Sequence, residues 1–211
     1  MALRPEPQPT FTILTVCTGN ICRSPLAEQY LRAGLAGLDH VELGSAGTMA
    51  SDGDRMPTQA QSLSRAYGGV PDAHRARFLF ESHVSGADLV LAMAREHRRA
   101  VVAMHPRASR YTFTLREFAR LAGGLTDEDL FEVARMPQTA SADRLRAVVA
   151  LVAARRGFVP NASDPVHDDV VDPYRRSDSV YEASAQQLVP AADIVIRALG
   201  RAVNISVEAA R

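Results

Sequence analysis

One short segment constrains the fold of this chain more than any other. Residues 17–25 are Cys-Thr-Gly-Asn-Ile-Cys-Arg-Ser-Pro, with an apolar run over 11–16 before them and a helical pattern over 25–32 after them. This order is typical of a buried strand, a tight turn and a helix that opens at a proline. Backbone N–H groups at a helix N-terminus stabilise anions. The segment therefore predicts an α/β fold with an oxyanion-binding loop after its first strand.

The rest of the chain alternates between strand-like and helix-like patterns. We expect further strands over 40–45, 88–93 and 109–114. Helices are expected over 57–67, 94–104, 114–121 and 178–202. Such alternation predicts a doubly wound parallel sheet flanked by helices, with the loop at the carboxyl end of a strand.

The length of 211 residues fits one domain over 11–211, preceded by a flexible N-terminal extension over 1–10. Between about 123 and 164 the pattern changes to what we interpret as a helical insertion. Thr126 and Ser141 each precede a helical run and are expected to cap it. Residues 157–169 are expected to form an irregular connector.

Composition narrows the possible partners and the location. The formal net charge is zero and no basic cluster is interleaved with aromatics, so no nucleic-acid partner is expected. No apolar run reaches membrane-spanning length and the N-terminus lacks a signal-peptide core, so we expect a cytoplasmic protein without a membrane partner. The basic side chains are all arginine, which is typical of GC-rich bacterial genomes. Both cysteines lie in the loop, which excludes a disulfide framework and a four-cysteine zinc site.

Cys17 is the candidate nucleophile. A helix N-terminus and the nearby Arg23 guanidinium both favour a thiolate, and the guanidinium fork can grip two oxygens of a phosphoryl group. Gly19 and Asn20 suit a tight loop because both enter the left-handed backbone region readily. The residues expected to bind the phosphoryl oxygens are Thr18, Gly19, Asn20, Ile21, Cys22 and Arg23.

Two more features of the loop need an interpretation. Ser24 is placed to donate a hydrogen bond to the Cys17 thiolate. Cys22 is either a small buried loop residue or a resolving thiol with a redox role, which would trap oxidised Cys17 as a reversible disulfide.

Cleavage of a phosphate ester also requires a proton donor, and a carboxyl group is the usual one. Asp172 precedes a proline, which biases it toward an extended or turn conformation on a loop. Asp172 is therefore the candidate acid. Asp164 also precedes a proline, and we interpret it as a solvated turn residue.

Taken together, these residues resemble the low-molecular-weight protein tyrosine phosphatase family. The resemblance continues, in the family's order, through Gly44-Ser45-Ala46-Gly47-Thr48, His74-Arg75-Ala76-Arg77, Asp88-Leu89-Val90-Leu91-Ala92-Met93 and Asp172-Pro173-Tyr174. It implies that Cys17 is the nucleophile, that Arg23 binds phosphate and that Ser24 stabilises the thiolate. It also implies that Asp172 acts first as acid and then as base, through a cysteinyl-phosphate intermediate.

The same resemblance assigns supporting roles. Ser45 and His74 would hydrogen-bond around Asn20 and hold the loop in shape. Tyr174 would border the mouth of the site and pack against a phosphotyrosine ring.

Residues 172–177 look like those of bacterial members that oppose tyrosine kinases of polysaccharide export. The implied partner is a phosphotyrosine protein, such as one of these kinases. No cofactor or metal is expected, because the Arg23 guanidinium and the helix N-terminus already supply positive charge. The physiological substrate and the oligomeric state are left open.

Two other functions stay open. Related proteins on this fold use the same loop to reduce arsenate, and with no cysteine outside the loop this chain would need a low-molecular-weight thiol as reductant. The third is a non-catalytic phosphotyrosine-binding protein that uses the insertion as its contact surface. Asp172 favours the phosphatase, because an aryl phosphate needs a proton donor and arsenate does not.

Two departures from the family pattern bear on substrate selection. The insertion moves Asp172 far along the chain from Met93, and the stretch after Gly47 has no aromatic residue for the second wall of the cleft. The insertion either covers the cleft and narrows it, or lies at the far edge and binds a partner.

Overall fold

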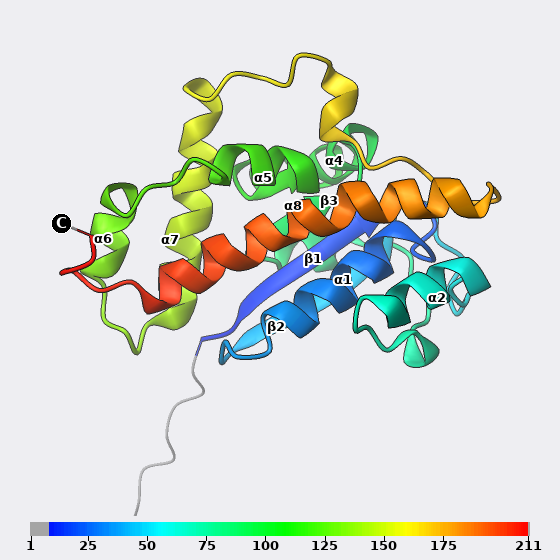
Figure 1. Ribbon diagram of the computed structural model, residues 1–211, viewed down its shortest axis with the longest axis horizontal. Coiled ribbons are helices and arrows are strands. Elements are labelled where there is room, and N and C mark those ends of the chain that lie inside the picture. The colour runs from blue at the N-terminus through cyan, green and yellow to red at the C-terminus, as the bar shows by residue number, and fades with distance from the viewer. Residues whose placement is uncertain (1–8, 211) are drawn as a thin grey trace, which may run out of the picture.

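The computed structural model describes residues 9–210. The expected N-terminal extension over 1–10 lies outside these residues, apart from Pro9 and Thr10. The described part of the chain forms a parallel sheet between helical layers (Figure 1).

The sheet has four parallel strands in the order β2-β1-β3-β4. They are β1 (Phe11–Cys17), β2 (Val41–Gly47), β3 (Leu89–Ala92) and β4 (Thr112–Thr114). Cys17 pairs with Gly47, and its neighbour Val16 pairs with Ala92. The carboxyl ends of the three longest strands therefore meet at one edge, and the predicted α/β class is confirmed.

In the described part of the chain, eight α-helices connect and cover the strands. They are α1 (Arg23–Gly34), α2 (Thr58–Ala66), α3 (Glu81–Ser85), α4 (Arg95–Met104), α5 (Leu115–Ala122), α6 (Phe131–Ala134), α7 (Ser141–Ala154) and α8 (Asp178–Asn204). Short 3-10 helices are η1 (Pro71–Ala73), η2 (Pro106–Arg110), η3 (Glu128–Leu130), η4 (Arg155–Gly157) and η5 (Pro165–Asp168). Within residues 9–210, no helix combines the length and the apolar character needed to cross a membrane.

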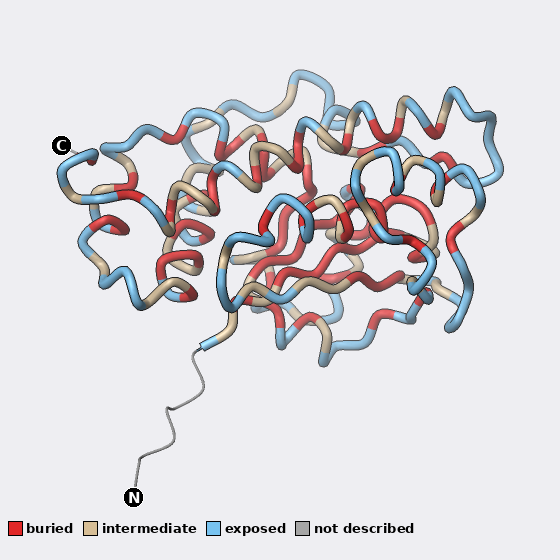
Figure 2. Tube along the Cα trace, turned by 60° about the horizontal axis from the view of Figure 1, so that its bottom comes forward, coloured by how far each residue is buried: buried red, intermediate tan, exposed pale blue. Residues whose placement is uncertain are grey.

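Alternation along β1 separates two hydrophobic layers. Phe11 and Ile13 face a core shared with α1, α5, α7 and α8, whereas Leu14 and Val16 face a smaller core shared with α3, α4 and η2. Both faces of β1 are consequently buried, as the red strands at the centre of Figure 2 show. This rigid central strand carries the loop at its carboxyl end.

Two expectations from the sequence differ from the structure. The strand expected over 109–114 is only β4, because Pro106 starts the 3-10 helix η2 and holds residues 106–110 out of the sheet. Ser141 does not cap α7: it is the first helical residue, and its hydroxyl donates to the Gln138 carbonyl. Asp127 and not Thr126 directly precedes η3, but Thr126 stabilises its start, since its hydroxyl accepts from Asp129 N at 3.1 Å.

The insertion packs against the sheet edge rather than extending into solvent. Leu145, Val148 and Val152 of α7 are fully buried in the core that β1, α5 and α8 share. The Arg156 guanidinium donates to the carbonyls of Ser109 (2.8 Å) and Thr112 (2.6 Å), and so pairs backbone groups at the open side of β4. In Figure 1, α6 and α7 lie at the end of the molecule away from the carboxyl end of β1.

We expect Leu145→Ala to lower the free energy of unfolding by about 2–5 kcal/mol, because it opens a cavity in this shared core. Urea denaturation followed by circular dichroism measures the change. Glu132→Ala, an exposed change in α6, is the control and should alter stability by less than about 0.5 kcal/mol. A loss below about 1 kcal/mol for Leu145→Ala would show that the insertion unfolds separately from the rest.

Candidate active site

The loop between β1 and α1 closes around Cys17. Cys17, Asn20, Arg23 and Ser24 are all buried, with exposed fractions of 2%, 0%, 4% and 0%. Asn20 adopts a left-handed backbone conformation with φ of 52°, as the sequence predicts. α1 begins at Arg23, so the loop ends at a helix N-terminus.

Hydrogen bonds through Asn20 fix the direction of the bond between Ser24 and Cys17. The backbone N–H of Arg77 donates to Asn20 Oδ1 at 3.0 Å, which turns the amide Nδ2 toward Ser24. Nδ2 donates to Ser24 Oγ at 2.9 Å, and Ser24 Oγ lies 3.0 Å from Cys17 Sγ. The Ser24 hydroxyl proton is therefore free to point at the sulfur, an arrangement that stabilises a thiolate.

His74 and Ser45 occupy different places around this network. His74 Nε2 lies 2.7 Å from the backbone oxygen of Asn20, and since that oxygen can only accept, Nε2 carries the proton. Ser45 does not contact Asn20: its hydroxyl donates to Glu28 Oε2 at 2.5 Å. The expectation for Ser45 is wrong in this detail, because the Ser45 side chain faces α1 and the Arg77 backbone takes the place beside Asn20.

Gly47 lets the chain after β2 press against the loop. The N–H groups of Thr48 and Met49 donate to the carbonyls of Cys17 and Thr18, each at 2.9 Å. A Cβ at position 47 would lie 2.5 Å from the Thr18 oxygen. A side chain there would push the two segments apart.

The segment that carries Asp172 is held in place by several anchors. Asp168 pairs with Arg120 at 2.9 Å, and Asp169 pairs with Arg95 at 2.9 Å. The buried Val170 donates its N–H to the Met93 carbonyl at 2.8 Å. These contacts fix both the position and the direction of the chain just before Asp172.

Asp172 lies directly across from the loop. Its Oδ2 is 2.9 Å from Arg23 Nη2, while Arg23 Nη1 donates to the Val170 carbonyl at 3.1 Å. Cys17 and Asp172 are far apart in the sequence, but the contact with Arg23 holds Asp172 next to the loop that contains Cys17. Asp164, by contrast, accepts from Val166 N in a local turn.

A cavity of about 250 Å³ joins these groups. Its lining residues are Cys17, Thr18, Gly19, Ile21, Cys22, Arg23, Met49, Ser51, Asp54, Asp172 and Tyr174. Sequence reasoning missed Met49, Ser51 and Asp54, although their position directly after the 44–48 motif is a usable signal. Within residues 9–210, no part of the 123–164 insertion lines this cavity.

Tyr174 forms one wall of the mouth, as the resemblance implies. It is partly exposed, its N–H donates to Asp172 Oδ1 at 3.2 Å, and the Arg175 guanidinium lies 5.0 Å from its ring centre. The exposed side chain of Met49 lines the same cavity, in the stretch after Gly47 that has no aromatic residue. The cavity therefore has apolar lining from both segments.

His97 is a neighbour of the loop that sequence reasoning did not identify. It is 2% exposed, and its Nε2 lies 2.8 Å from Thr18 Oγ1. Burial, reinforced by the Arg23 charge, lowers the pKa of His97 to about 4, so the imidazole is neutral near pH 7. A neutral ring can fix the Thr18 side chain without adding positive charge to the site.

Cys22 and Cys17 are both free thiols. Burial raises the pKa of Cys22 to about 12, with the Tyr181 hydroxyl 3.8 Å from the sulfur. In this conformation Cys22 is a protonated thiol, which favours the interpretation as a buried loop residue. Its redox role stays a prediction.

Comparison with known proteins identifies close relatives. The family model described as "Low molecular weight phosphotyrosine protein phosphatase" matches residues 12–157. The chain is 39% identical over 108 residues to a protein-arginine-phosphatase of Geobacillus stearothermophilus, covering 51% of this chain and 71% of that protein. It is 40% identical over 106 residues to the probable low molecular weight protein-tyrosine-phosphatase EpsP of Ralstonia solanacearum, covering 50% and 71%.

Solved structures agree with this assignment. The YwlE arginine phosphatase of Geobacillus stearothermophilus superposes with a TM-score of 0.63 at 27% identity, over 90% of this chain and 93% of that one. The low molecular weight protein tyrosine phosphatase of T. tengcongensis gives a TM-score of 0.62 at 31% identity, over 89% and 99%. The family match ends before Asp172, so the position of that residue rests on the geometry above.

We expect Cys22 to resist alkylation in the folded protein. With Cys17 removed by Cys17→Ser, iodoacetamide at pH 8 should modify Cys22 at least tenfold more slowly than free cysteine, because the raised pKa keeps the thiol protonated. Mass spectrometry measures the rate, and the urea-unfolded variant is the control that should react fully. Modification of the folded protein at the free-cysteine rate would contradict this account of Cys22.

Proposed function

Because this chain belongs to the low molecular weight phosphotyrosine protein phosphatase family, we propose that it hydrolyses phosphotyrosine in proteins through a phosphocysteine on Cys17. Membership makes the chain a phosphatase, and the site supports this particular reaction. The observation that carries the proposal is the 2.9 Å contact between Arg23 and Asp172, because it holds a carboxyl group at the cavity that Cys17 also lines.

In the first step, the Cys17 thiolate attacks phosphorus and the bond from phosphorus to the tyrosine oxygen breaks. Protonated Asp172 gives its proton to the departing oxygen, so tyrosine leaves neutral. Arg23 and the N–H groups of the loop hold the other phosphoryl oxygens, whose charge they stabilise in the transition state. The Ser24 hydroxyl, oriented by Asn20, lowers the energy of the attacking thiolate.

In the second step, the Asp172 carboxylate accepts a proton from water. The water oxygen attacks phosphorus, the bond from sulfur to phosphorus breaks, and the Cys17 thiolate returns as inorganic phosphate forms. The acid of the first step is thus the base of the second. Arg23 supplies the positive charge at the phosphoryl group, and the chemistry calls for no cofactor.

The walls of the cavity favour an aromatic substrate. Ile21, Met49 and Tyr174 present apolar surface on the path from the loop to solvent, which suits the faces of a phenyl ring. Among phosphotyrosine proteins, a bacterial tyrosine kinase of polysaccharide export is the substrate that residues 172–177 predict.

Phosphoarginine in proteins is the second candidate substrate. Relatives from Geobacillus stearothermophilus and Bacillus subtilis carry arginine phosphatase in their names, and the carboxylates of Asp54 and Asp172 at the cavity are acceptors that a guanidinium would use. A phenyl ring has no N–H group that could donate a hydrogen bond to Asp54. Hydrolysis of phosphoarginine should therefore depend on Asp54 more than hydrolysis of phosphotyrosine does.

We expect Asp172→Ala to lower kcat/KM for phenyl phosphate by about 10²- to 10⁴-fold, because phenolate is a poor leaving group without a proton donor. With 2,4-dinitrophenyl phosphate, whose leaving group needs no proton, the loss in kcat/KM should stay below about tenfold, because kcat/KM reports the first step and not the shared hydrolysis of the phosphocysteine. Asp164→Ala, at the other Asp-Pro sequence, is the matched control and should leave both rates unchanged. Equal slowing of both substrates by Asp172→Ala would remove this residue from the acid role.

We expect kcat/KM for a phosphotyrosine peptide to exceed that for the same peptide with phosphoarginine. Asp54→Asn should leave the phosphotyrosine rate within about twofold, because the phenyl ring makes no hydrogen bond there. Phosphate release measures both reactions, and Cys17→Ser is the inactive control. A preference for phosphoarginine that Asp54→Asn abolishes would establish the second candidate, and thiol-dependent arsenate reduction without phosphate release would contradict both.

A further inference from the structure

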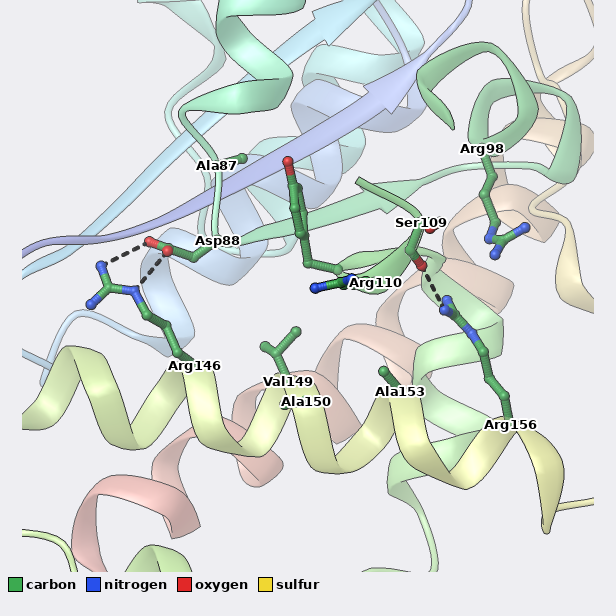
Figure 3. A pocket seen from close by; sticks show the side chains of 11 residues that line it. Ala87, Asp88, Arg98, Ser109, Arg110, Arg146, Val149, Ala150, Ala153 and Arg156 are labelled. Carbon is green, nitrogen blue, oxygen red and sulfur yellow. Dashed lines mark hydrogen bonds and ion pairs between the residues drawn. The ribbon is translucent and has the colours of Figure 1, made fainter. Parts of the chain in front are cut away.

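A second cavity, of about 690 Å³, lies between the insertion helix α7 and the start of β3 (Figure 3). Its lining residues are Ala87, Asp88, Arg98, Ser109, Arg110, Tyr111, Arg146, Val149, Ala150, Ala153 and Arg156. Asp88 immediately precedes β3, so the cavity opens near the amino end of the sheet, whereas Cys17 lies at the carboxyl end of β1. The two cavities share no residue.

The lining of this second cavity carries more arginines than acidic residues. Four of its lining residues are arginines, and Asp88 is the one acid among them. Figure 3 shows Arg146 beside Asp88 at one end, Arg98 and Arg156 toward the other, and Arg110 between them. Glu117, behind the wall, pairs with Arg98 and Arg156 but leaves the arginines in excess.

Two of these arginines are fixed by hydrogen bonds to the surrounding structure. The Arg146 guanidinium donates hydrogen bonds to Asp88, Asp143 and the Thr10 carbonyl, at 2.7 to 2.9 Å. The Arg156 guanidinium donates hydrogen bonds to Glu117 and to the carbonyls of Ser109 and Thr112. Both guanidinium groups are thereby fixed as parts of the wall.

The other two arginines, Arg98 and Arg110, have guanidinium N–H groups without a hydrogen-bond partner among the described residues. Within the described residues, the hydrogen bond and the ion pair of the Arg98 side chain both use Nε, which donates to the Thr112 carbonyl at 3.2 Å and lies 3.4 Å from Glu117 Oε2. Within residues 9–210, its two Nη groups make no hydrogen bond, and the side chain of Arg110 makes neither a hydrogen bond nor an ion pair. Arg98 and Arg110 line the cavity together with Arg146, Arg156 and Asp88, whose charged groups are already paired with neighbours.

One wall of the cavity is apolar and made of small residues. Val149, Ala150 and Ala153 lie on consecutive turns of α7, and Ala87 adds to the same lining. Because these side chains are small, the cavity between α7 and η2 stays open. Burying this apolar surface under a ligand removes it from water, which is favourable.

We propose that this cavity binds a small organic anion: a carboxylate, sulfonate or phosphate group joined to an aliphatic or aromatic body. The anionic group pairs with Arg98 and Arg110, and the body covers the apolar face of α7. Inorganic phosphate alone would leave that face uncovered. The volume is that of a site for a drug-sized ligand, and the site is distinct from the one that holds Cys17.

The test uses 8-anilinonaphthalene-1-sulfonate as the probe on the full chain, in phosphate buffer so that phosphate competes for the loop at Cys17. Saturable fluorescence enhancement is expected. Arg110→Ala should weaken binding by about tenfold, because it removes a charged hydrogen-bond donor. Ala150→Glu, an exposed change on the apolar wall, should weaken binding at least as much by repelling the sulfonate.

Arg107→Ala is the matched control, because Arg107 is an exposed arginine of the same 3-10 helix that does not line the cavity. It should bind the probe like the natural chain, and all three variants should hydrolyse phenyl phosphate at the unchanged rate. Equal weakening by Arg107→Ala and Arg110→Ala would overturn the proposal, as would binding that Ala150→Glu leaves intact. Displacement of the probe by a hexaglutamate peptide but not by 1-naphthoate would replace it with a protein-docking surface.

Discussion

Asn20 ties together the backbone and the chemistry of the loop at Cys17. It is fully buried, it occupies the left-handed region, and its side-chain amide bonds to Ser24 on one side and to the Arg77 backbone on the other. An unpaired amide in such a place would cost about 1–3 kcal/mol for each group left without a partner. The orientation of the Ser24 hydroxyl, and through it the environment of the Cys17 sulfur, follows from this one residue.

The carboxyl side of the site shows how a segment distant in sequence from the loop is held in place. Residues 123–164 intervene between α5 and the Asp172 segment, yet the segment returns to a fixed place because Asp168 and Asp169 pair with arginines of α5 and α4. Within the intervening residues, α7 adds to the larger core. The distance from Arg23 to Asp172 therefore depends on ion pairs close to the site and not on the length of chain before it.

Local patterns in the sequence predicted local features well. Apolar runs located β1 and β3, and the residue types of the loop predicted the left-handed Asn20. The strand expected over 109–114 is shorter, because the effect of Pro106 reaches past its immediate neighbours. The contacts of Ser45, the place of His97 and the second cavity depend on which helices pack together. No single stretch of sequence carries that information.

The guanidinium that covers β4 has a consequence for biosynthesis. Arg156 emerges from the ribosome well after residues 112–114, so until it has been made the Thr112 carbonyl at this strand edge has only the 3.2 Å bond from Arg98. A less covered edge is a better template for pairing with another chain. Full protection from intermolecular strand addition is therefore a property of a chain that includes Arg156, and a translation product truncated within α7 lacks the shorter of the two bonds.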